Sequence, residues 1–150
     1  AALGRVSDEP LLSGPGLARI YAFLRAQAPE AAPGALDAAL AAGAGAEAIT
    51  RFAARHADGL ALATLELFAE CYGQVAGDHA LAVRATGGVF VAGGLAPKLL
   101  PLLRAGAFLR GFGAKGAQAP LMANLPVHVV INESLGLLGA AVIASRDAPA

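Results

Sequence analysis

One stretch, residues 85–100 (ATGGVFVAGGLAPKLL), constrains the fold of this chain more than any other. Residues 89–91 predict a strand that is buried on both faces, because β-branched and aromatic residues between glycine pairs suit a strand with helices on either side. Pro97 suits the first turn of a helix, where a missing N–H costs nothing. The stretch therefore predicts a strand that passes into a helix through Gly93 and Gly94.

This order of elements has two interpretations. A strand that leads into a helix through glycines brings bare backbone and helix-terminal N–H groups to the carboxyl edge of a sheet, where ligands of open α/β sheets bind. The same glycines can also serve tight packing alone. The pattern by itself favours packing and leaves a ligand platform open.

Composition narrows the class of protein. A chain of 150 residues forms one domain or part of one. A formal net charge of zero excludes the basic surface that nonspecific nucleic-acid binding needs. The hydrophobic fraction of 57% is dominated by Ala, and Gly, Pro or Asn interrupts each uncharged run before about 20 residues, so we expect a soluble chain with no membrane partner.

Cys71 is the only cysteine, which excludes an internal disulfide and a cysteine-based metal cluster and fits a reducing cytoplasm. The histidines, His56, His79 and His128, lack metal-ligand spacing and are interpreted as structural or surface residues. The chain begins without methionine and shows no signal peptide. We expect it to be part of a longer cytoplasmic protein.

The first half of the chain predicts helices. Ser13 can cap a helix over 15–28, with Pro15 in its first turn. Residues 29–45 predict a surface connector with one short helical piece around 36–40. A strong apolar pattern then predicts one long, largely buried helix over 46–83, kinked or thinned near its two glycines, Gly73 and Gly77.

The second half predicts a short helix over 98–103 and then a glycine-rich loop over 111–116. The loop contains Lys115, but it lacks the order G-x-x-x-x-G-K-[ST] and a preceding buried strand, so we reject a phosphate-binding P-loop. Lys98 and Lys115 are kept as side chains that could lie near nucleotide phosphates. A surface or rim role is the favoured interpretation of the loop.

A second strand is predicted over 126–132, then a turn, then a helix over 135–144 whose small residues permit close packing on the sheet. Helices therefore alternate with two parallel strands, which is typical of an α/β fold. Two strands do not make a stable sheet alone. The other strands must come from a missing N-terminal part, a partner chain or an oligomer.

Four stretches together carry a resemblance to a known family: VSDEPLLSGPGLARIY, GGVFVAGGLAPKLLPLL, GFGAKGAQAPLMANLPVHVV and GLLGAA. They resemble the C-terminal part of bacterial glucokinases, in the hexokinase-like branch of the actin and sugar-kinase superfamily. The resemblance covers nearly the whole chain. It implies an α/β fold in which 1–150 form the C-terminal part of the large lobe of a ribonuclease H-like ATPase domain, with helices packed on a partial sheet.

The resemblance also implies site residues. Glu9 matches a glutamate that hydrogen-bonds sugar hydroxyls, and without the family it would be interpreted as a solvated loop charge. Asp8 beside it points elsewhere, so the two make a poor acid/base pair. For the nucleotide, Gly93 and Gly94 would let the purine approach the backbone. The other implied nucleotide residues are Leu95 and Lys98, and also Ser13 and Gly14, which would line the nucleotide side of the cleft.

The family's phosphate loop, catalytic aspartate and EGGH sugar motif match nothing in 1–150, so no catalytic residue is expected here and the chain alone should be inactive. The resemblance implies that the full-length protein phosphorylates glucose with ATP and Mg²⁺, as a cytoplasmic homodimer. Two alternatives remain: a non-catalytic nucleotide- or sugar-sensing regulatory domain of the same superfamily, and a purely structural half-domain. Hexose specificity, phosphoryl donor and oligomeric state are not fixed by the sequence.

Overall fold

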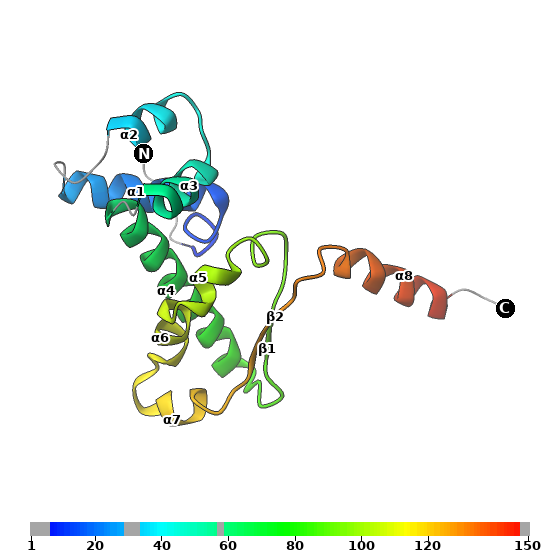
Figure 1. Cartoon of the computed structure of the whole chain (residues 1–150). Coiled ribbons are helices and arrows are strands. Elements are labelled where there is room, and N and C mark those ends of the chain that lie inside the picture. Colours follow the sequence, from blue (N-terminus) through cyan, green and yellow to red (C-terminus); the bar gives the residue numbers. More distant parts are fainter. Residues whose placement is uncertain (1–6, 29–33, 57–58, 148–150) are drawn as a thin grey trace.

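A computed structural model describes residues 7–28, 34–56 and 59–147 (Figure 1). Helices pack on one side of a small parallel sheet, which confirms a helix-rich α/β chain. The strands are β1 (Val89–Val91) and β2 (Val127–Val129), and a single 3₁₀ turn spans Gly116–Gln118. The helices are α1 (Gly14–Gln27), α2 (Gly34–Ala41), α3 (Ala46–His56), α4 (Gly59–Ala82), α5 (Leu100–Arg104), α6 (Ala107–Gly113), α7 (Ala119–Met122) and α8 (Leu135–Asp147).

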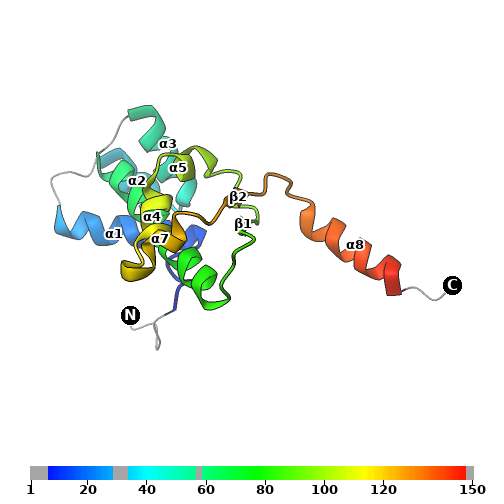
Figure 2. The ribbon, with the colours of Figure 1, turned by 90° about the horizontal axis from the view of Figure 1, so that it is seen from below.

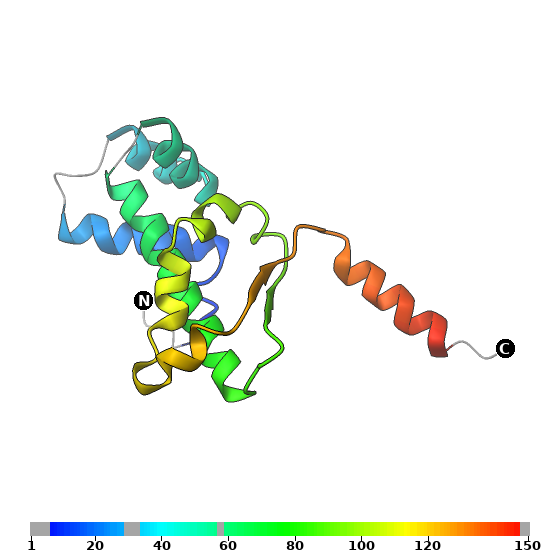
Figure 3. The ribbon, with the colours of Figure 1, turned by 60° about the horizontal axis from the view of Figure 1, so that its bottom comes forward.

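The centre of the molecule is the packing of α6 against α4, which lie side by side in Figures 1 and 3. Phe68, Phe108 and Phe112 are buried, and the Tyr72 ring meets Phe108 edge-on with 5.6 Å between the ring centroids. The backbones approach closely because glycines face each other. A Cβ on Gly73 would overlap the Phe108 carbonyl, and one on Gly111 would overlap the Glu70 carbonyl.

The amino-terminal helices form the rest of the core. Ser13 is the N-cap of α1, and its Oγ accepts a hydrogen bond from the Gly16 N–H at 3.2 Å, as predicted. Leu17 and Ile20 of α1 are buried against α3 and α4. The capped first turn of α1 is therefore anchored to the core.

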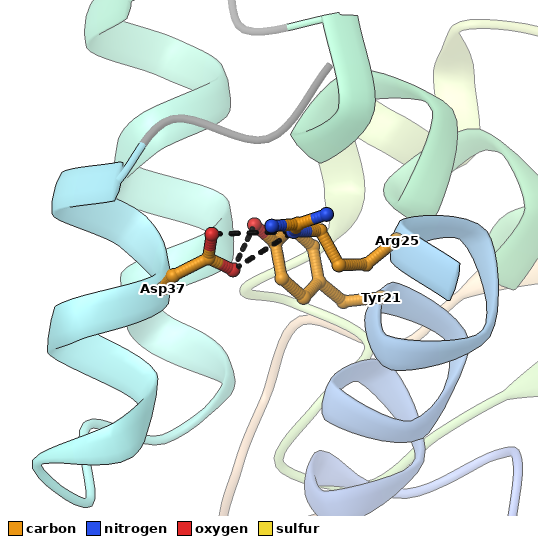
Figure 4. Close-up of polar contacts among 3 residues, drawn as sticks. All are labelled: Tyr21, Arg25 and Asp37. Atoms are coloured by element: carbon orange, nitrogen blue, oxygen red, sulfur yellow. Dashed lines mark hydrogen bonds and ion pairs between the residues drawn. The ribbon is translucent and has the colours of Figure 1, made fainter. Parts of the chain in front are cut away.

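A polar cluster joins α2 to α1 (Figure 4). The Tyr21 hydroxyl donates to Asp37 Oδ1 at 3.2 Å, and the Arg25 Nε lies 3.2 Å from Asp37 Oδ2. Beside the cluster Leu36 is fully buried. The short helical piece is confirmed, but this part of the predicted surface connector contributes to the core because Leu36 fills a gap between helices.

The two strands pair in parallel with Val89 opposite Val127, as predicted. Valines on one face turn toward the helices, while the side chain at the middle of β1, Phe90, is 67% exposed. Its ring stacks on His128 across the ladder, with 5.0 Å between centroids. The prediction that the first strand is covered on both faces is therefore wrong for this chain, because helices cover only one face.

Three predicted elements differ from the structure. The long helix over 46–83 is two helices, α3 and α4, and the segment between them, 57–58, lies outside the described residues. The Ala57-Asp58-Gly59 sequence is a turn signal that the apolar pattern obscured. Within α4 the glycines Gly73 and Gly77 are continuous helix, and they serve close approach to α6 instead of a kink.

The loop predicted over 111–116 begins inside helix α6, because Gly111 and Phe112 face α4 and are buried. The helix predicted over 98–103 begins later, at Leu100, and Pro101 instead of Pro97 lies in its first turn. The turn at 132–134 is confirmed, since the Ser134 N–H donates to Asn132 Oδ1 at 2.9 Å.

Helix α8 extends away from the body in all three ribbon views (Figures 1, 2 and 3). Residues 135–146 are exposed, so the predicted packing on the sheet does not occur among the described residues. Its small residues, Gly136 and Gly139, have no atom within 4 Å of a built Cβ. Among the described residues, no helix combines the length and the hydropathy needed to cross a membrane.

Candidate functional site

The turn that follows β1 is the first part of the candidate site. β1 ends at Val91, and the chain then turns through Gly93, whose φ of +102° favours glycine. The Ala96 N–H donates to the Gly93 carbonyl at 3.3 Å, which closes the turn. Bare backbone thus lies at the carboxyl end of a parallel strand, as predicted.

Gly94 differs from Gly93 in its reason for being glycine. It is exposed, its φ is not in the left-handed region, and no atom lies within 4 Å of the position where a Cβ would stand. Neither backbone strain nor packing within the described residues requires glycine there. The open space in front of Gly94 leaves room for another group to approach the backbone.

Leu95 and Lys98 continue this turn. Leu95 is half-buried against the core, and Lys98 is exposed. Because α5 begins at Leu100, both residues lie in the turn before the helix and not in the helix that the sequence predicts. Lys98 therefore provides an exposed amine in the same turn as the glycines.

Glu9 lies in a tight turn before α1. The Leu11 and Leu12 N–H groups both donate to the Asp8 carbonyl at 2.9 Å, and Arg19 Nη1 donates to the Pro10 carbonyl at 2.7 Å. Gly16 holds the turn against α1, since a Cβ there would overlap the Leu11 carbonyl. Glu9 is exposed on this fixed backbone. Its carboxylate is available to a ligand.

Ser13 and Gly14 open α1 directly after that turn. The Ser13 Oγ accepts the capping hydrogen bond, so its hydroxyl hydrogen remains as a donor. No atom lies within 4 Å of a Cβ built on Gly14. Both residues are half-buried, at the amino end of a 14-residue helix.

Lys115 has a structural role. Its Nζ lies 2.8 Å from the Gln74 carbonyl and 2.6 Å from Asp78 Oδ1, and only 8% of its side chain is exposed. The amine therefore ties the end of α6 to α4. This arrangement argues against the expectation that Lys115 lies near nucleotide phosphates.

The other titratable groups of the described residues show no arrangement typical of a metal site or an acid/base pair. Burial raises the pKa of the Cys71 thiol, with a smaller contribution from the Glu70 charge, and burial also raises the pKa of Tyr72. His79 and His128 are exposed, as predicted, and the His56 side chain lies outside the described residues. Within the described ranges no group of three metal-ligating side chains occurs.

Grooves beside the sheet were missed at the sequence level. One of about 530 Å³ lies between α4 and β1 and is lined by Val75, Val83 and Phe90 among others. Another of about 510 Å³ lies between α5, α6 and β2. The sequence predicts a covered strand and therefore assigns to the core apolar residues, such as Phe90, that line an open groove. The sequence carries no signal that separates these two environments.

Known proteins match this chain over nearly its whole length. The Glucokinase family model matches residues 1–147. The glucokinase of Synechocystis sp. is 42% identical over 97% of this chain and 44% of its own length, and that of Nostoc sp. is 40% identical over 95% and 45%. A crystal structure of glucokinase from an Antarctic psychrotroph superimposes with a TM-score of 0.79 at 30% identity, over 97% of this chain and 42% of that one.

Helices on a small parallel sheet that ends in a glycine turn make this an α/β chain with the architecture of part of a sugar kinase. The chain belongs to the glucokinase family. It spans less than half of the length of the curated relatives named above. The resemblance drawn from the sequence motifs is thereby confirmed.

Proposed function

We propose that the complete protein containing this chain transfers the γ-phosphoryl group of ATP to glucose and yields glucose 6-phosphate. In this proposal residues 1–150 form the C-terminal part of the large, ribonuclease H-like lobe, in a cytoplasmic homodimer. They supply the adenosine pocket and a sugar-binding glutamate, while the phosphate cradle and the catalytic base come from elsewhere in the protein. Family membership and the similarity to glucokinases over 93–97% of this chain support it.

The place of Gly94 just after the carboxyl end of β1, with open space in front of its backbone, is the observation that carries the nucleotide assignment. Within the described part of the chain, neither the φ of Gly94 nor a packing contact gives this position a reason to be glycine. Approach of a flat ligand to the backbone supplies one, because any side chain would occupy that space. Gly93 shapes the turn, and Leu95 provides an apolar neighbour.

The described residues fit adenosine and a phosphate chain better than they fit a metal ion. Gly93, Gly94 and Leu95 would hold the base, while the exposed Lys98 amine, with Ser13 and Gly14 on the nucleotide side of the cleft, would face the polar part of ATP. ATP supplies the phosphoryl group that is transferred. Mg²⁺ would come with the nucleotide, since the described part of the chain has no cluster of ligands for it.

Glu9 would accept hydrogen bonds from glucose hydroxyls. The fixed turn at 8–12 and the tight contact at Gly16 hold its backbone in place, so the side chain extends from a fixed position. A charged acceptor binds hydroxyls more strongly than a neutral one does. The role of Glu9 is therefore to bind and orient the sugar and not to move a proton.

The test uses a chimera in which this 150-residue chain replaces the matching region of the Synechocystis relative. The chimera should form ADP in a glucose-dependent manner. In it Gly94→Val should raise the KM for ATP roughly tenfold or more and leave the KM for glucose within about twofold, because about 1.4 kcal/mol of lost binding is a factor of ten.

Gly87→Val is the matched control. Gly87 is also exposed, has no atom within 4 Å of a built Cβ and lies at the other end of β1. An equal effect of both substitutions, or none at Gly94, would remove the adenosine assignment. A folded chimera without glucose-dependent turnover would remove the kinase proposal, and leave a sensing domain as the better reading.

A further inference from the structure

The turn that carries Glu9 is held by the helix that follows it, α1, at two positions. Gly16 lies so close to the Leu11 carbonyl that a Cβ would overlap it. Further along α1, Arg19 Nη1 donates to the Pro10 carbonyl at 2.7 Å. Residues three positions apart lie on the same face of a helix, so the turn rests on the Gly16–Arg19 face of α1.

The Arg19 bond restrains the part of the turn next to Glu9. The two backbone hydrogen bonds of the turn both end on the Asp8 carbonyl, and both come from N–H groups that follow Pro10 in the chain. Pro10 itself has no N–H to donate. The Pro10 carbonyl comes directly after Glu9, so the Arg19 guanidinium ties to α1 the peptide group that adjoins Glu9.

An arginine is well suited to this contact. Long side chains of a helix point toward its amino end, which is where the turn lies. The guanidinium is always charged and presents its donors in a rigid plane, and a charged donor makes short hydrogen bonds. Within the described ranges Arg19 has no carboxylate at ion-pair distance. A substitution of Arg19 therefore removes chiefly its bond to Pro10.

This bond is expected to matter more for a ligand than for the stability of the fold. Arg19 and Glu9 are both exposed, and substitutions at exposed positions usually change global stability little. A hydrogen bond to a ligand, in contrast, weakens steeply when its length or angle is wrong. A displacement of about 1 Å far from the reacting atoms can cost about a hundredfold in activity.

We propose that Arg19 is a positioning residue for the sugar, which holds the backbone from which the Glu9 carboxylate extends and does not touch the sugar itself. The inference rests on the proposed function, because it takes Glu9 as the acceptor of glucose hydroxyls. ATP binding is independent of Arg19, since Ser13 on the nucleotide side is held by its own capping bond to the Gly16 N–H.

Kinetics of the chimera test the inference. Arg19→Met keeps an apolar stem but removes the donor, and it should raise the KM for glucose roughly threefold to tenfold, the factor that corresponds to one modest hydrogen bond. The KM for ATP should stay within about twofold, and the Tm within about 2 °C. Arg19→Lys keeps a charged donor and should fall between wild type and Arg19→Met. Arg51→Met, at an exposed arginine of α3, is the matched control and should change neither KM.

A double variant shows whether Arg19 acts through Glu9. In a Glu9→Ala background the carboxylate is gone, so the position of the turn no longer matters to the sugar. Adding Arg19→Met there should weaken glucose binding by less than about twofold, because the effects of residues that act together are not additive. The full threefold to tenfold loss in both backgrounds would mean that Arg19 does not act through Glu9, and it overturns the inference.

Hydrogen exchange in the chimera tests the restraint without glucose. The Leu11 and Leu12 amides, which close the turn, should exchange roughly threefold to tenfold faster in Arg19→Met than in wild type, since exchange reports local opening. Amides in the middle of α4 should be unchanged. Unchanged exchange at both leucines overturns the inference.

The remaining outcomes separate the inference from the proposed function. Normal glucose binding by the wild-type chimera, together with an unchanged KM for glucose in Arg19→Met, removes the inference alone. So does an equal rise of both KM values in Arg19→Met, or an equal effect of Arg51→Met. A folded wild-type chimera that does not bind glucose removes the proposed function, and the inference falls with it.

Discussion

Glycines and large apolar side chains occur both where α4 packs on α6 and along α8, but they are buried in the first place and exposed in the second. On the α4–α6 side, glycines at 73 and 111 allow two backbones to touch, and the aromatic side chains around them are buried. On α8, no atom lies within 4 Å of a Cβ built on Gly136 or Gly139, and the leucines between them are exposed. Small residues spaced along a helix indicate close packing, and they do not indicate whether the partner is in the same chain.

Gly111 offers the strongest test of the packed side. A methyl group at Gly111 would overlap the Glu70 carbonyl, so Gly111→Ala should destabilise the chain by about 3 kcal/mol or more, as overpacking does when backbone must move. Gly113→Ala, in the same helix but with no atom within 4 Å, should have little effect. Urea unfolding of both variants measures the difference, and equal stabilities would show that α4 and α6 are not in close contact.

Lys115 and Lys98 extend the comparison to a buried and an exposed amine. Lys115→Met keeps an apolar stem but removes the amine that binds Gln74 and Asp78, and it should cost about 1–3 kcal/mol of stability. Lys98→Met, at an exposed position, should change the free energy of unfolding by less than about 0.5 kcal/mol. If Lys115→Met is as stable as the wild type, the amine is free and a role near phosphate returns.

The smallest effect on the free energy of unfolding is expected in α8. In the 150-residue chain alone, Leu138→Asp should change the free energy of unfolding by less than about 0.5 kcal/mol, because Leu138 and its neighbours in α8 are exposed. Leu65→Asp, on the buried face of α4, should unfold the chain by comparison. Circular dichroism during urea titration checks both. A large loss from Leu138→Asp would mean that α8 already packs on this chain.

The sequence predicted elements well where local signals act alone. Ser13 and Pro15 place the start of α1 within one residue, and the parallel strands at 89 and 127 are confirmed. The sequence did not predict burial correctly where burial depends on which other elements cover a residue. Phe90 has the residue type of a core strand, yet its side chain is 67% exposed, with the His128 ring stacked beside it.

In the candidate site, too, local patterns were predicted from the sequence, and features that depend on neighbours in space were not. The glycine turn after β1 was predicted from pattern, and the structure separates Gly93, which needs its positive φ, from Gly94, which does not. The sequence could not separate Lys115 from Lys98, because sequence distance hides that Asp78 and Gln74 lie beside Lys115. The role of Glu9 rests on the family resemblance alone, since an exposed carboxylate in a turn carries no signal of its own.

Glucose binding by Glu9→Gln in the chimera tests the central claim, that this chain presents a sugar-binding carboxylate, most directly. Losing one charged hydrogen-bond acceptor should weaken glucose binding roughly tenfold to a hundredfold and leave ATP binding within about twofold. Asp8→Asn, at the neighbouring exposed carboxylate, is the matched control and should change neither. Unchanged glucose affinity in folded Glu9→Gln, or an equal loss in Asp8→Asn, would contradict the account.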